Sequence, residues 1–294
     1  MLKHLKEKPT LPSRVVILGA GGFVASAIQR KLQKLDILVF PLSRNDLDLT
    51  MLDSGDRLSK LLRFEDVLLF ISAKAPVKNE DMLIENLRMG RSVCEALRKT
   101  AVSQVVYISS DAVYADSEQP LTEASSAQPG SLHGIMHLAR EIMLSNVYDG
   151  PMCFLRPTLI YGSEDPHNGY GPNRFMRLAA AGKDILLFGE GEEQRDHVWV
   201  EDVAEIILRV VLNKSEGKLN IATGTVTSFR KIAEMAASYF NNNIKITGSH
   251  RIGRMPHNGF RPFDRSNTQL AFPDFIYTSL ENGLPLNNKS TNLS

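Results

Sequence analysis

A short apolar run near the start of the chain ends abruptly at a glycine-rich turn. Arg14-Val-Val-Ile-Leu18 is rich in β-branched residues and is typical of a fully buried strand in a parallel sheet. Gly19-Ala-Gly-Gly-Phe-Val-Ala25 follows, and it leads directly into a helical stretch over residues 26–35. A second apolar run over 37–42 completes a strand, turn, helix and strand in succession. Two strands joined through a helix pack parallel in one sheet, so this segment predicts an α/β fold.

The same alternation continues through the first half of the chain. It predicts a doubly wound parallel sheet of the Rossmann type, because strands that alternate with long helices form right-handed crossovers. Beyond about residue 161 the loops become rich in glycine, proline and asparagine, and the pattern predicts a smaller C-terminal α/β lobe that lies over the sheet. The last residues, 285–294, are polar, and we expect them to fray. The further predicted strands are 67–72, 104–109 and 152–156, and the further predicted helices are 82–99, 134–146, 174–181, 203–212 and 229–240.

Composition excludes several classes of protein. The 294 residues include 34 Lys and Arg against 33 Asp and Glu, and a formal net charge of +1 gives no reason to expect nucleic acid or an anionic membrane as partner. No apolar run approaches the roughly 20 residues that span a bilayer, and the basic N-terminus lacks the pattern of a secretory signal. The two cysteines, Cys94 and Cys153, cannot form a disulfide scaffold or a cysteine-based zinc site. We therefore expect a soluble cytoplasmic enzyme.

The glycine turn has the spacing of a dinucleotide-binding motif. Gly19 allows a tight turn, Gly22 lets the backbone approach a pyrophosphate at a helix N-terminus, and Ala25 is small enough for close helix–strand packing. Such a turn also occurs in proteins that bind no nucleotide, but its place directly after the first strand favours NAD(P) binding.

The end of the second predicted strand bears on the choice of cofactor. It reads Pro41-Leu-Ser43-Arg44-Asn45, without an acidic residue to bind the ribose hydroxyls of NAD. An arginine here can bind the 2′-phosphate of NADP, so the sequence favours NADP over NAD. The alternative is that Arg44 is a solvated surface charge.

A series of short motifs follows the glycine turn, Gly19-Ala-Gly-Gly-Phe-Val24, along nearly the whole chain. They are Asp48-Leu49, Asn86 to Gly90, Ser109-Ser-Asp-Ala-Val-Tyr114, Arg156-Pro-Thr-Leu-Ile-Tyr-Gly162, Gln194-Arg-Asp-His-Val-Trp-Val-Glu-Asp202, Leu219-Asn-Ile-Ala-Thr-Gly224 with Thr227-Ser228, and Arg261-Pro-Phe-Asp264. In this order the motifs resemble those of the extended short-chain dehydrogenase/reductases of the NAD-dependent epimerase/dehydratase family. The order makes the combination specific, although each motif alone is not.

The resemblance implies chemistry on a nucleoside-diphosphate sugar, with nicotinamide taking or returning a hydride. It also implies an NAD(P)-binding Rossmann domain over residues 1–161 plus about 194–224, and a discontinuous small substrate-binding lobe over 162–193 and 225–294. Many members dimerise through a four-helix bundle, which helices 82–99 and 134–146 could form here. The cofactor-binding positions that we expect are Gly19, Gly22, Phe23, Val24, Ser43, Arg44, Asp48, Leu49, Ser72, Ala73, Ala75, Asn86 and His137.

The chain departs from the family at the two residues that the resemblance makes catalytic. Its tyrosine position holds His133 and its lysine position holds His137, within Pro129-Gly-Ser-Leu-His133-Gly-Ile-Met-His137-Leu-Ala-Arg-Glu141. A neutral imidazole is a competent base near pH 7, so His133 could relay the proton of a sugar hydroxyl and His137 could still bind the nicotinamide ribose. Two other readings stay open: a redox-silent protein that binds NAD(P) or nucleotide sugar, and a non-redox acid–base enzyme. A metal site made of His133, His137 and Glu141 is the least favoured reading.

The remaining predicted site residues contact substrate. Ser110 takes the position of the family's Ser or Thr that holds the substrate hydroxyl, and Asp111 takes that of an acid in the dehydratases. Arg195 and Arg261 match two arginines that hold the diphosphate, for which guanidinium forks are suited. Leu159 replaces an asparagine that contacts substrate in many epimerases, which leaves the sugar open.

Overall fold

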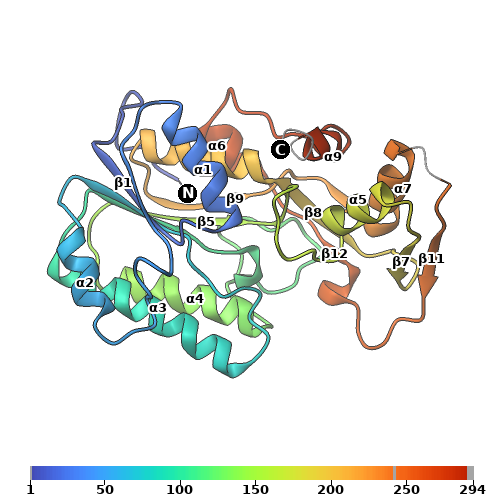
Figure 1. Ribbon diagram of the computed structural model, residues 1–294, viewed down its shortest axis with the longest axis horizontal. Coiled ribbons are helices and arrows are strands. Elements are labelled where there is room, and N and C mark those ends of the chain that lie inside the picture. The colour runs from blue at the N-terminus through green and yellow to red at the C-terminus, as the bar shows by residue number, and fades with distance from the viewer. Residues whose placement is uncertain (1, 241–242, 290–294) are drawn as a thin grey trace.

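The structure, a computed structural model, describes residues 2–240 and 243–289. At its centre is a sheet of six parallel strands in the order β2-β1-β3-β4-β5-β9 (Figure 1). This order confirms the predicted doubly wound Rossmann sheet. The strands are β1 (Arg14–Leu18), β2 (Val39–Leu42), β3 (Asp66–Phe70), β4 (Gln104–Ile108), β5 (Met152–Pro157) and β9 (Gly217–Ile221).

Helices cover both faces of this sheet. Helices α1 (Phe23–Gln33) and α6 (Val200–Leu212) lie on one face, and α2 (Ser54–Leu61), α3 (Glu80–Lys99) and α4 (Leu132–Ser145) lie on the other (Figure 1). Every residue of β1, β3 and β4 is buried, and the side chains of the two faces form separate apolar cores. The parallel strands are therefore covered on both sides, as their continuous apolar runs predict.

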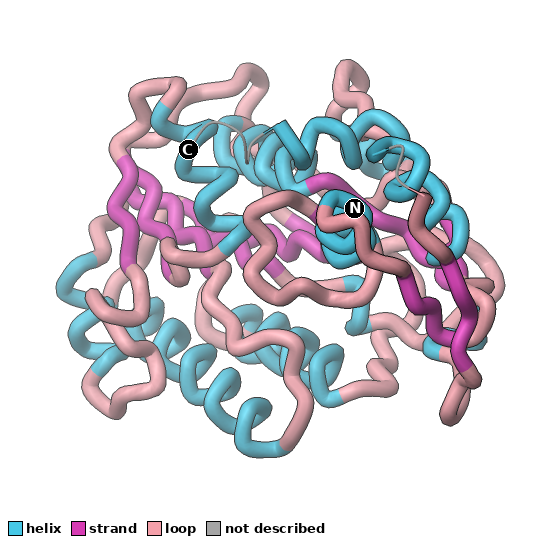
Figure 2. The backbone as a smooth tube through the Cα atoms, turned by 45° about the vertical axis from the view of Figure 1, so that its right-hand side comes forward, coloured by secondary structure: helices cyan, strands magenta, loops and turns pink. Residues whose placement is uncertain are grey.

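The remaining elements are η1 (Asp111–Val113), β6 (Leu159–Tyr161), α5 (Pro172–Ala180), β7 (Ile185–Phe188), β8 (Gln194–Trp199), β10 (Val226–Ser228), α7 (Phe229–Phe240), β11 (Ile246–Ser249), η2 (Pro256–Gly259), β12 (Phe260–Arg261), α8 (Ser266–Ala271) and α9 (Leu280–Lys289). Two of them lie against the elements of the central sheet: η1 contacts α4, and α8 contacts β9. Most of the others form a second, smaller region (Figure 2), in which α5 packs against α7 and β11 pairs in parallel with β7. Side chains of β6, α5, β7, α7 and α9 form a separate apolar core there.

Two local predictions need correction. Helix α2 was not predicted, since its polar sequence contains Gly55 and buries few side chains. The segment 285–294 was expected to fray, but its first five residues belong to α9, which buries Leu284. Residues 290–294 lie outside the described part of the chain. In that part, no helix is both long and apolar enough to cross a membrane.

Candidate functional site

The glycine turn lies at the carboxyl edge of the central sheet. Gly19 has a φ of +90°, and a Cβ atom there would come within 2.7 Å of the Cα of Ser72, which follows β3. Gly22 precedes α1, and no side chain caps the helix or places an acid in its first turn. The N-terminal amides of α1 are thus left for an anionic ligand, and the turn fits a dinucleotide pyrophosphate.

The phenyl ring of Phe23 joins this turn to a distant segment. A Cβ atom at Gly162 would lie 2.5 Å from the Cζ of Phe23, so the ring packs directly on that glycine. Val24 packs against the core of the sheet. Both residues lie at the predicted cofactor site, where they hold the turn in place by packing.

The end of β2 is followed by an acid, Asp46, that was not among the predicted site residues. Asp46 accepts hydrogen bonds from the backbone N and the Oγ of Ser43, at 2.8 and 2.6 Å. The Nε of Arg44 donates to Asp48 at 3.1 Å, yet the Arg44 side chain remains 73% exposed. Hydrogen bonds from Thr50 lower the pKa of Asp48. Leu49 is buried next to these residues, so this edge combines one exposed cation with two acids.

Asn86 shapes the loop that follows β3. Its side chain is fully buried, and it pairs with the backbone N and O of Lys74, each at 3.0 Å. Ala73 and Ala75 flank Lys74 in this loop and carry no polar side chain. Through these two hydrogen bonds, Asn86 of α3 fixes the backbone of the predicted cofactor-binding loop.

Helix α4 begins directly against the end of β4. Ser131 caps it by accepting a hydrogen bond from the N of Gly134, at 3.2 Å. A Cβ atom on Gly134 would collide with the carbonyl oxygen of Ala112 in η1, so only glycine allows this approach. Ser110 caps η1 through the N of Ala112, at 3.1 Å. His133, in the first turn of α4, is therefore held beside η1.

The two histidines of α4 form a pair. The rings of His133 and His137 meet edge to face with centroids 4.7 Å apart, and the Nδ1 of His137 lies 2.7 Å from the hydroxyl of Tyr107. Burial lowers the pKa of His133, and lowers that of His137 well below 6.5. The Nδ1 of His133 is buried and has no hydrogen-bond partner among the described residues. Both imidazoles are thus neutral at pH 7, the form in which His133 can accept a proton.

The carboxylate of Glu141 forms a buried ion pair with Arg156, and both of its oxygens accept hydrogen bonds. Arg156 donates to its two oxygens at 2.9 and 2.6 Å, and the Oγ of Ser109 donates at 2.6 Å. Arg156 also donates to the hydroxyl of Tyr114, at 2.8 Å. Glu141 therefore ties α4 to β4 and β5. No group of three His, Cys, Asp or Glu side chains in the described ranges is arranged to hold a metal ion.

Three predicted substrate residues meet at Asp111, which follows β4. The Nε of Arg261 donates to its carboxylate at 3.1 Å, and the Nη2 donates to its backbone oxygen at 2.7 Å. The Nη2 of Arg195 lies 3.7 Å from the same carboxylate, and its Nη1 donates to Glu193 at 3.3 Å. The Oγ of Ser110 donates to Asp111 at 3.2 Å. The side chain of Arg261 is 1% exposed and that of Arg195 is 11% exposed, so the guanidinium of Arg195 is the more accessible of the two.

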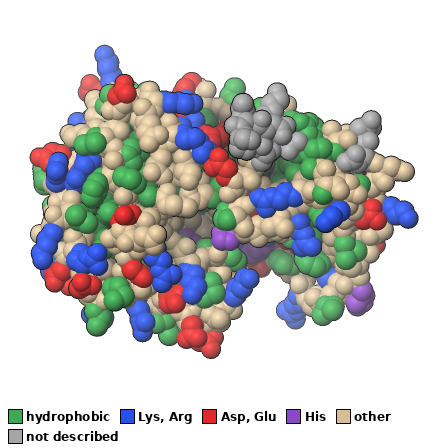
Figure 3. Space-filling view, viewed as in Figure 1, with side chains coloured by type: hydrophobic (Ala, Val, Ile, Leu, Met, Phe, Trp, Pro, Cys, Tyr) green, Lys and Arg blue, Asp and Glu red, His purple; other side chains and the backbone are tan. Residues whose placement is uncertain are grey.

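The molecular surface is hollowed between the two regions of the protein. Figure 3 shows histidine side chains inside this hollow and lysine or arginine side chains along its rim. A hollow of this kind suits an anionic ligand.

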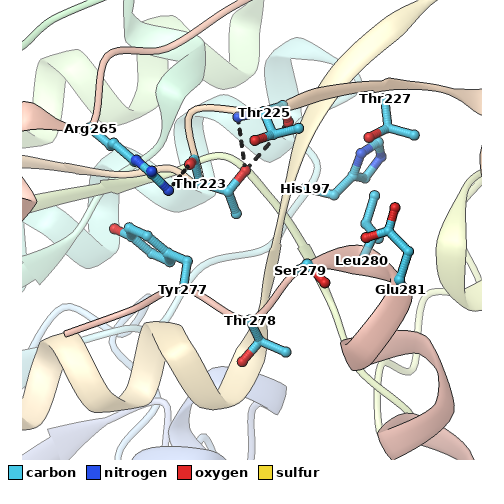
Figure 4. A pocket seen from close by; sticks show the side chains of 10 residues that line it. All are labelled: His197, Thr223, Thr225, Thr227, Arg265, Tyr277, Thr278, Ser279, Leu280 and Glu281. Atoms are coloured by element: carbon cyan, nitrogen blue, oxygen red, sulfur yellow. Dashed lines mark hydrogen bonds between the residues drawn. The ribbon is translucent and has the colours of Figure 1, made fainter.

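A second pocket of about 110 Å³ lies elsewhere, around the loop after β9 (Figure 4). The Oγ1 of Thr223 donates to Asp196 at 2.9 Å, which fixes the loop. His197 is 2% exposed, and burial together with Arg195 lowers its pKa to about 3. None of the predicted catalytic or cofactor-binding residues lines this pocket, which is formed by His197, Thr223, Thr225, Thr227, Arg265, Tyr277, Thr278, Ser279, Leu280 and Glu281.

Sequence reasoning missed two residues beside the histidine pair. Tyr107 holds His137, and the buried Arg140 follows His137 by three residues on the same face of α4. The signal for Arg140 is a charged residue within the buried stripe of a helix, where an apolar residue is usual.

Comparison with known proteins matches the chain to one family model and to several nucleotide-sugar enzymes. Residues 15–222 match the model of the NAD dependent epimerase/dehydratase family. The chain is 32% identical over 148 residues to the UDP-glucose 4-epimerase of Mycolicibacterium smegmatis, which covers 48% of this chain and 47% of that protein. It is 24% identical over 241 residues to the uncharacterized UDP-glucose epimerase YtcB of Bacillus subtilis, with 77% and 74% covered. The first match spans about half the length of that relative.

Solved structures share the fold. A UDP-glucose 4-epimerase of Thermotoga maritima, solved with UDP-glucose, superimposes with a TM-score of 0.85 at 21% identity, over 95% of this chain and 98% of that one. The UDP-glucose 4-epimerase of Thermus thermophilus, in complex with NAD, gives 0.84 at 22% identity, over 96% and 99%. The Rossmann sheet and the smaller C-terminal region are thus both found in these proteins.

Proposed function

The chain belongs to the NAD-dependent epimerase/dehydratase family, and on that premise we propose that it is an NAD(P)-dependent oxidoreductase of a nucleoside-diphosphate sugar. Epimerase, dehydratase and ketoreductase reactions all share one step. A sugar hydroxyl loses or gains its proton while the carbon that bears it loses or gains a hydride. The bound dinucleotide would supply the hydride acceptor or donor. The uncapped N-terminus of α1 and the close contact of Gly19 with Ser72 support the binding of that group.

The observation that carries the proposal is the position of His133. Its imidazole is neutral at pH 7 and lies beside η1, which Ser110 caps. In the proposed step, Ser110 holds the substrate hydroxyl by a hydrogen bond and His133 takes its proton. A neutral imidazole does this without a lysine to lower its pKa, because its ordinary pKa already lies near neutrality.

The other predicted residues complete the proposed site. Arg195 is the more available ligand for the diphosphate, because its contacts to Asp111 and Glu193 are long. Arg261 contributes charge to the same place from a more buried position. His137 binds the nicotinamide ribose, and Asp111 acts as the acid if the reaction is an elimination.

Titration calorimetry with NADPH, NADH, UDP-glucose and GDP-mannose tests the binding that this function needs. We expect micromolar affinity for a dinucleotide and for one of the two sugar nucleotides. Absence of binding by both dinucleotides would contradict the proposal and leave the glycine turn without its proposed role. Binding without turnover would instead support a redox-silent binding protein, and turnover by cofactor-free protein would support a non-redox enzyme.

We also propose that the cofactor is NADP(H) rather than NAD(H). Arg44→Ala should weaken NADPH binding about 10–100-fold and change NADH binding little, because a hydrogen bond between charged groups contributes about 1.5–3 kcal/mol. Calorimetry of the variant with each dinucleotide measures this. Lys60→Ala, which removes an exposed cation from the neighbouring α2, is the matched control. Equal losses for both dinucleotides would show that Arg44 does not read the 2′-phosphate.

Two further expectations belong to the same proposal: that two copies pair through α3 and α4, and that the protein is cytoplasmic. Ile84 of α3 and Ile135 and Ile142 of α4 are 47%, 41% and 55% exposed, which supports an apolar contact along these helices. Ile135 and Ile142 are seven residues apart and share one helix face.

A further inference from the structure

Arg140 of α4 is a buried cation without a carboxylate partner. Its side chain is fully buried, and no Asp or Glu oxygen of the described residues lies within ion-pair distance of it. The other three buried arginines each pair with a carboxylate within 3.1 Å, in the pairs Arg14–Asp66, Arg156–Glu141 and Arg261–Asp111.

The guanidinium of Arg140 contacts only neutral groups. Its Nε and Nη2 donate to the carbonyl oxygen of Asn86, at 2.9 and 2.6 Å, and its Nη1 donates to that of Ser72, at 2.8 Å. It also lies over the ring of Phe70, 4.8 Å from the centroid. These contacts give each of its three nitrogens an acceptor, but they do not neutralise its charge. A desolvated charge is costly, so its presence here calls for a reason beyond packing.

The surrounding helices leave space for this cation. A Cβ atom on Gly90 of α3 would lie 3.2 Å from the Cγ of Arg140, so the absence of a side chain at Gly90 makes room for it. Ser72, which accepts from the guanidinium, also contacts Gly19 of the glycine turn. Arg140 therefore lies between α3 and the end of β3, directly behind the predicted cofactor site.

Arg140 also faces the histidine pair. His133, His137 and Arg140 are spaced four and three residues apart and share one face of α4. After burial, the charge of Arg140 further lowers the pKa of both imidazoles. Asp111 of η1 opposes this effect at His133.

Other titratable groups packed around the cluster complete its charge balance. Tyr107 of β4 contacts both His137 and Arg140, and burial raises its pKa to about 12. Cys94 of α3 also faces Arg140, and burial raises its pKa to about 11. Both groups are therefore neutral at pH 7, as is His137. Glu141 of α4 faces Tyr107, but its charge is compensated by Arg156. The charge of Arg140 is therefore not compensated by these neighbours of the histidines.

We propose that Arg140 supplies the fixed positive charge of this site and stabilises, from inside the protein, the negative charge that forms on the substrate oxygen as His133 removes its proton. This inference rests on the proposed function. Arg140 does not touch the reacting atoms; it is a positioning residue that acts through its field and through its contacts to α3 at Asn86 and to the loop at Ser72. A fixed, desolvated cation needs no reorganisation when charge develops, which makes it effective in such a role.

The test is an NMR pH titration of the histidine rings in the full chain without substrate, comparing wild type with Arg140→Met and Arg140→Lys. With methionine we expect the pKa of His133 to rise, because a cation whose field lowers it has been removed. With lysine, which keeps the charge, the pKa should stay close to the wild-type value. Arg91→Met, which removes an exposed cation from the adjacent α3, should leave it unchanged. In turnover assays, kcat should fall about 10²-fold with methionine and much less with lysine.

Two outcomes would overturn the inference: an unchanged His133 pKa in folded Arg140→Met, or lysine and methionine variants that behave alike. If the methionine variant does not fold, Arg140→Gln removes the same charge while keeping an amide donor for the Asn86 carbonyl. Because the titration needs no substrate, it separates the two claims. A shifted pKa in a protein without turnover would contradict the proposed function and the oxyanion role that rests on it, and would leave only the electrostatic coupling of Arg140 to His133.

Discussion

Replacing His133 with alanine should lower kcat for the nucleotide-sugar reaction by about 10²–10⁴-fold, the usual contribution of a general acid–base group. The binding of dinucleotide should change little, because the glycine turn and the end of β2 lie on other elements. His250→Ala, which removes an exposed histidine, is the control and should keep full activity. A His133→Ala enzyme as fast as wild type would remove this histidine from the mechanism.

The pH profile gives a second, independent view of the same residue. Burial lowers the pKa of His133 below 6.5, so the imidazole stays neutral, and active as a base, to a lower pH than an exposed histidine. The rate kcat/KM should therefore be constant near pH 7 and fall only below about pH 6.5, as the ring takes up a proton. This acid limb should be absent from any residual activity of His133→Ala.

Replacing Glu141 with glutamine should lower the free energy of unfolding by about 3–5 kcal/mol, because it leaves Arg156 as an uncompensated buried charge. Both side chains are less than 5% exposed and are joined by two hydrogen bonds, at 2.9 and 2.6 Å. Glutamine keeps the shape of the side chain, so the loss reports on the charge. Urea unfolding followed by circular dichroism measures it.

A matched variant tests whether the loss of any ion-paired carboxylate lowers the free energy of unfolding as much as Glu141→Gln does. Glu205→Gln breaks partly exposed pairs with Arg209 and Lys31 and should cost no more than about 1 kcal/mol. Equal losses in the two variants would show that the Glu141–Arg156 pair does not hold α4 against the sheet as we describe.

The sheet could be predicted because its signals are local. The β-branched run of β1 and the glycines after it specify a buried strand, a tight turn and a helix start within about a dozen residues. The two histidines were predicted as site residues from the family resemblance, which places them in a segment whose proline, serine, glycine and glutamate match; their catalytic role stays a prediction. In the structure, Gly134 of that segment is needed because any side chain there would collide with Ala112 and keep α4 away from η1.

What could not be predicted depends on contacts between distant segments. The burial of Arg140 depends on Gly90, which leaves room for its side chain, and on the carbonyl oxygen of Ser72, which accepts its hydrogen bond. The sequence assigns Arg261 to a diphosphate, whereas the structure also shows its hydrogen bonds to Asp111 and to Asp116. Contacts such as these come from 50 to 150 residues away in the chain, beyond the reach of any local pattern.

Turnover of a nucleotide sugar at the histidine pair can be followed by NMR analysis of UDP-, GDP- and dTDP-linked sugars, incubated with the wild-type protein and NADP(H) or NAD(H). We expect that one of these sugars is converted to a new species, and that His133→Ala slows the conversion strongly. Unchanged sugars throughout the panel, in a protein that binds both dinucleotide and sugar nucleotide, would contradict it and identify a redox-silent binding protein.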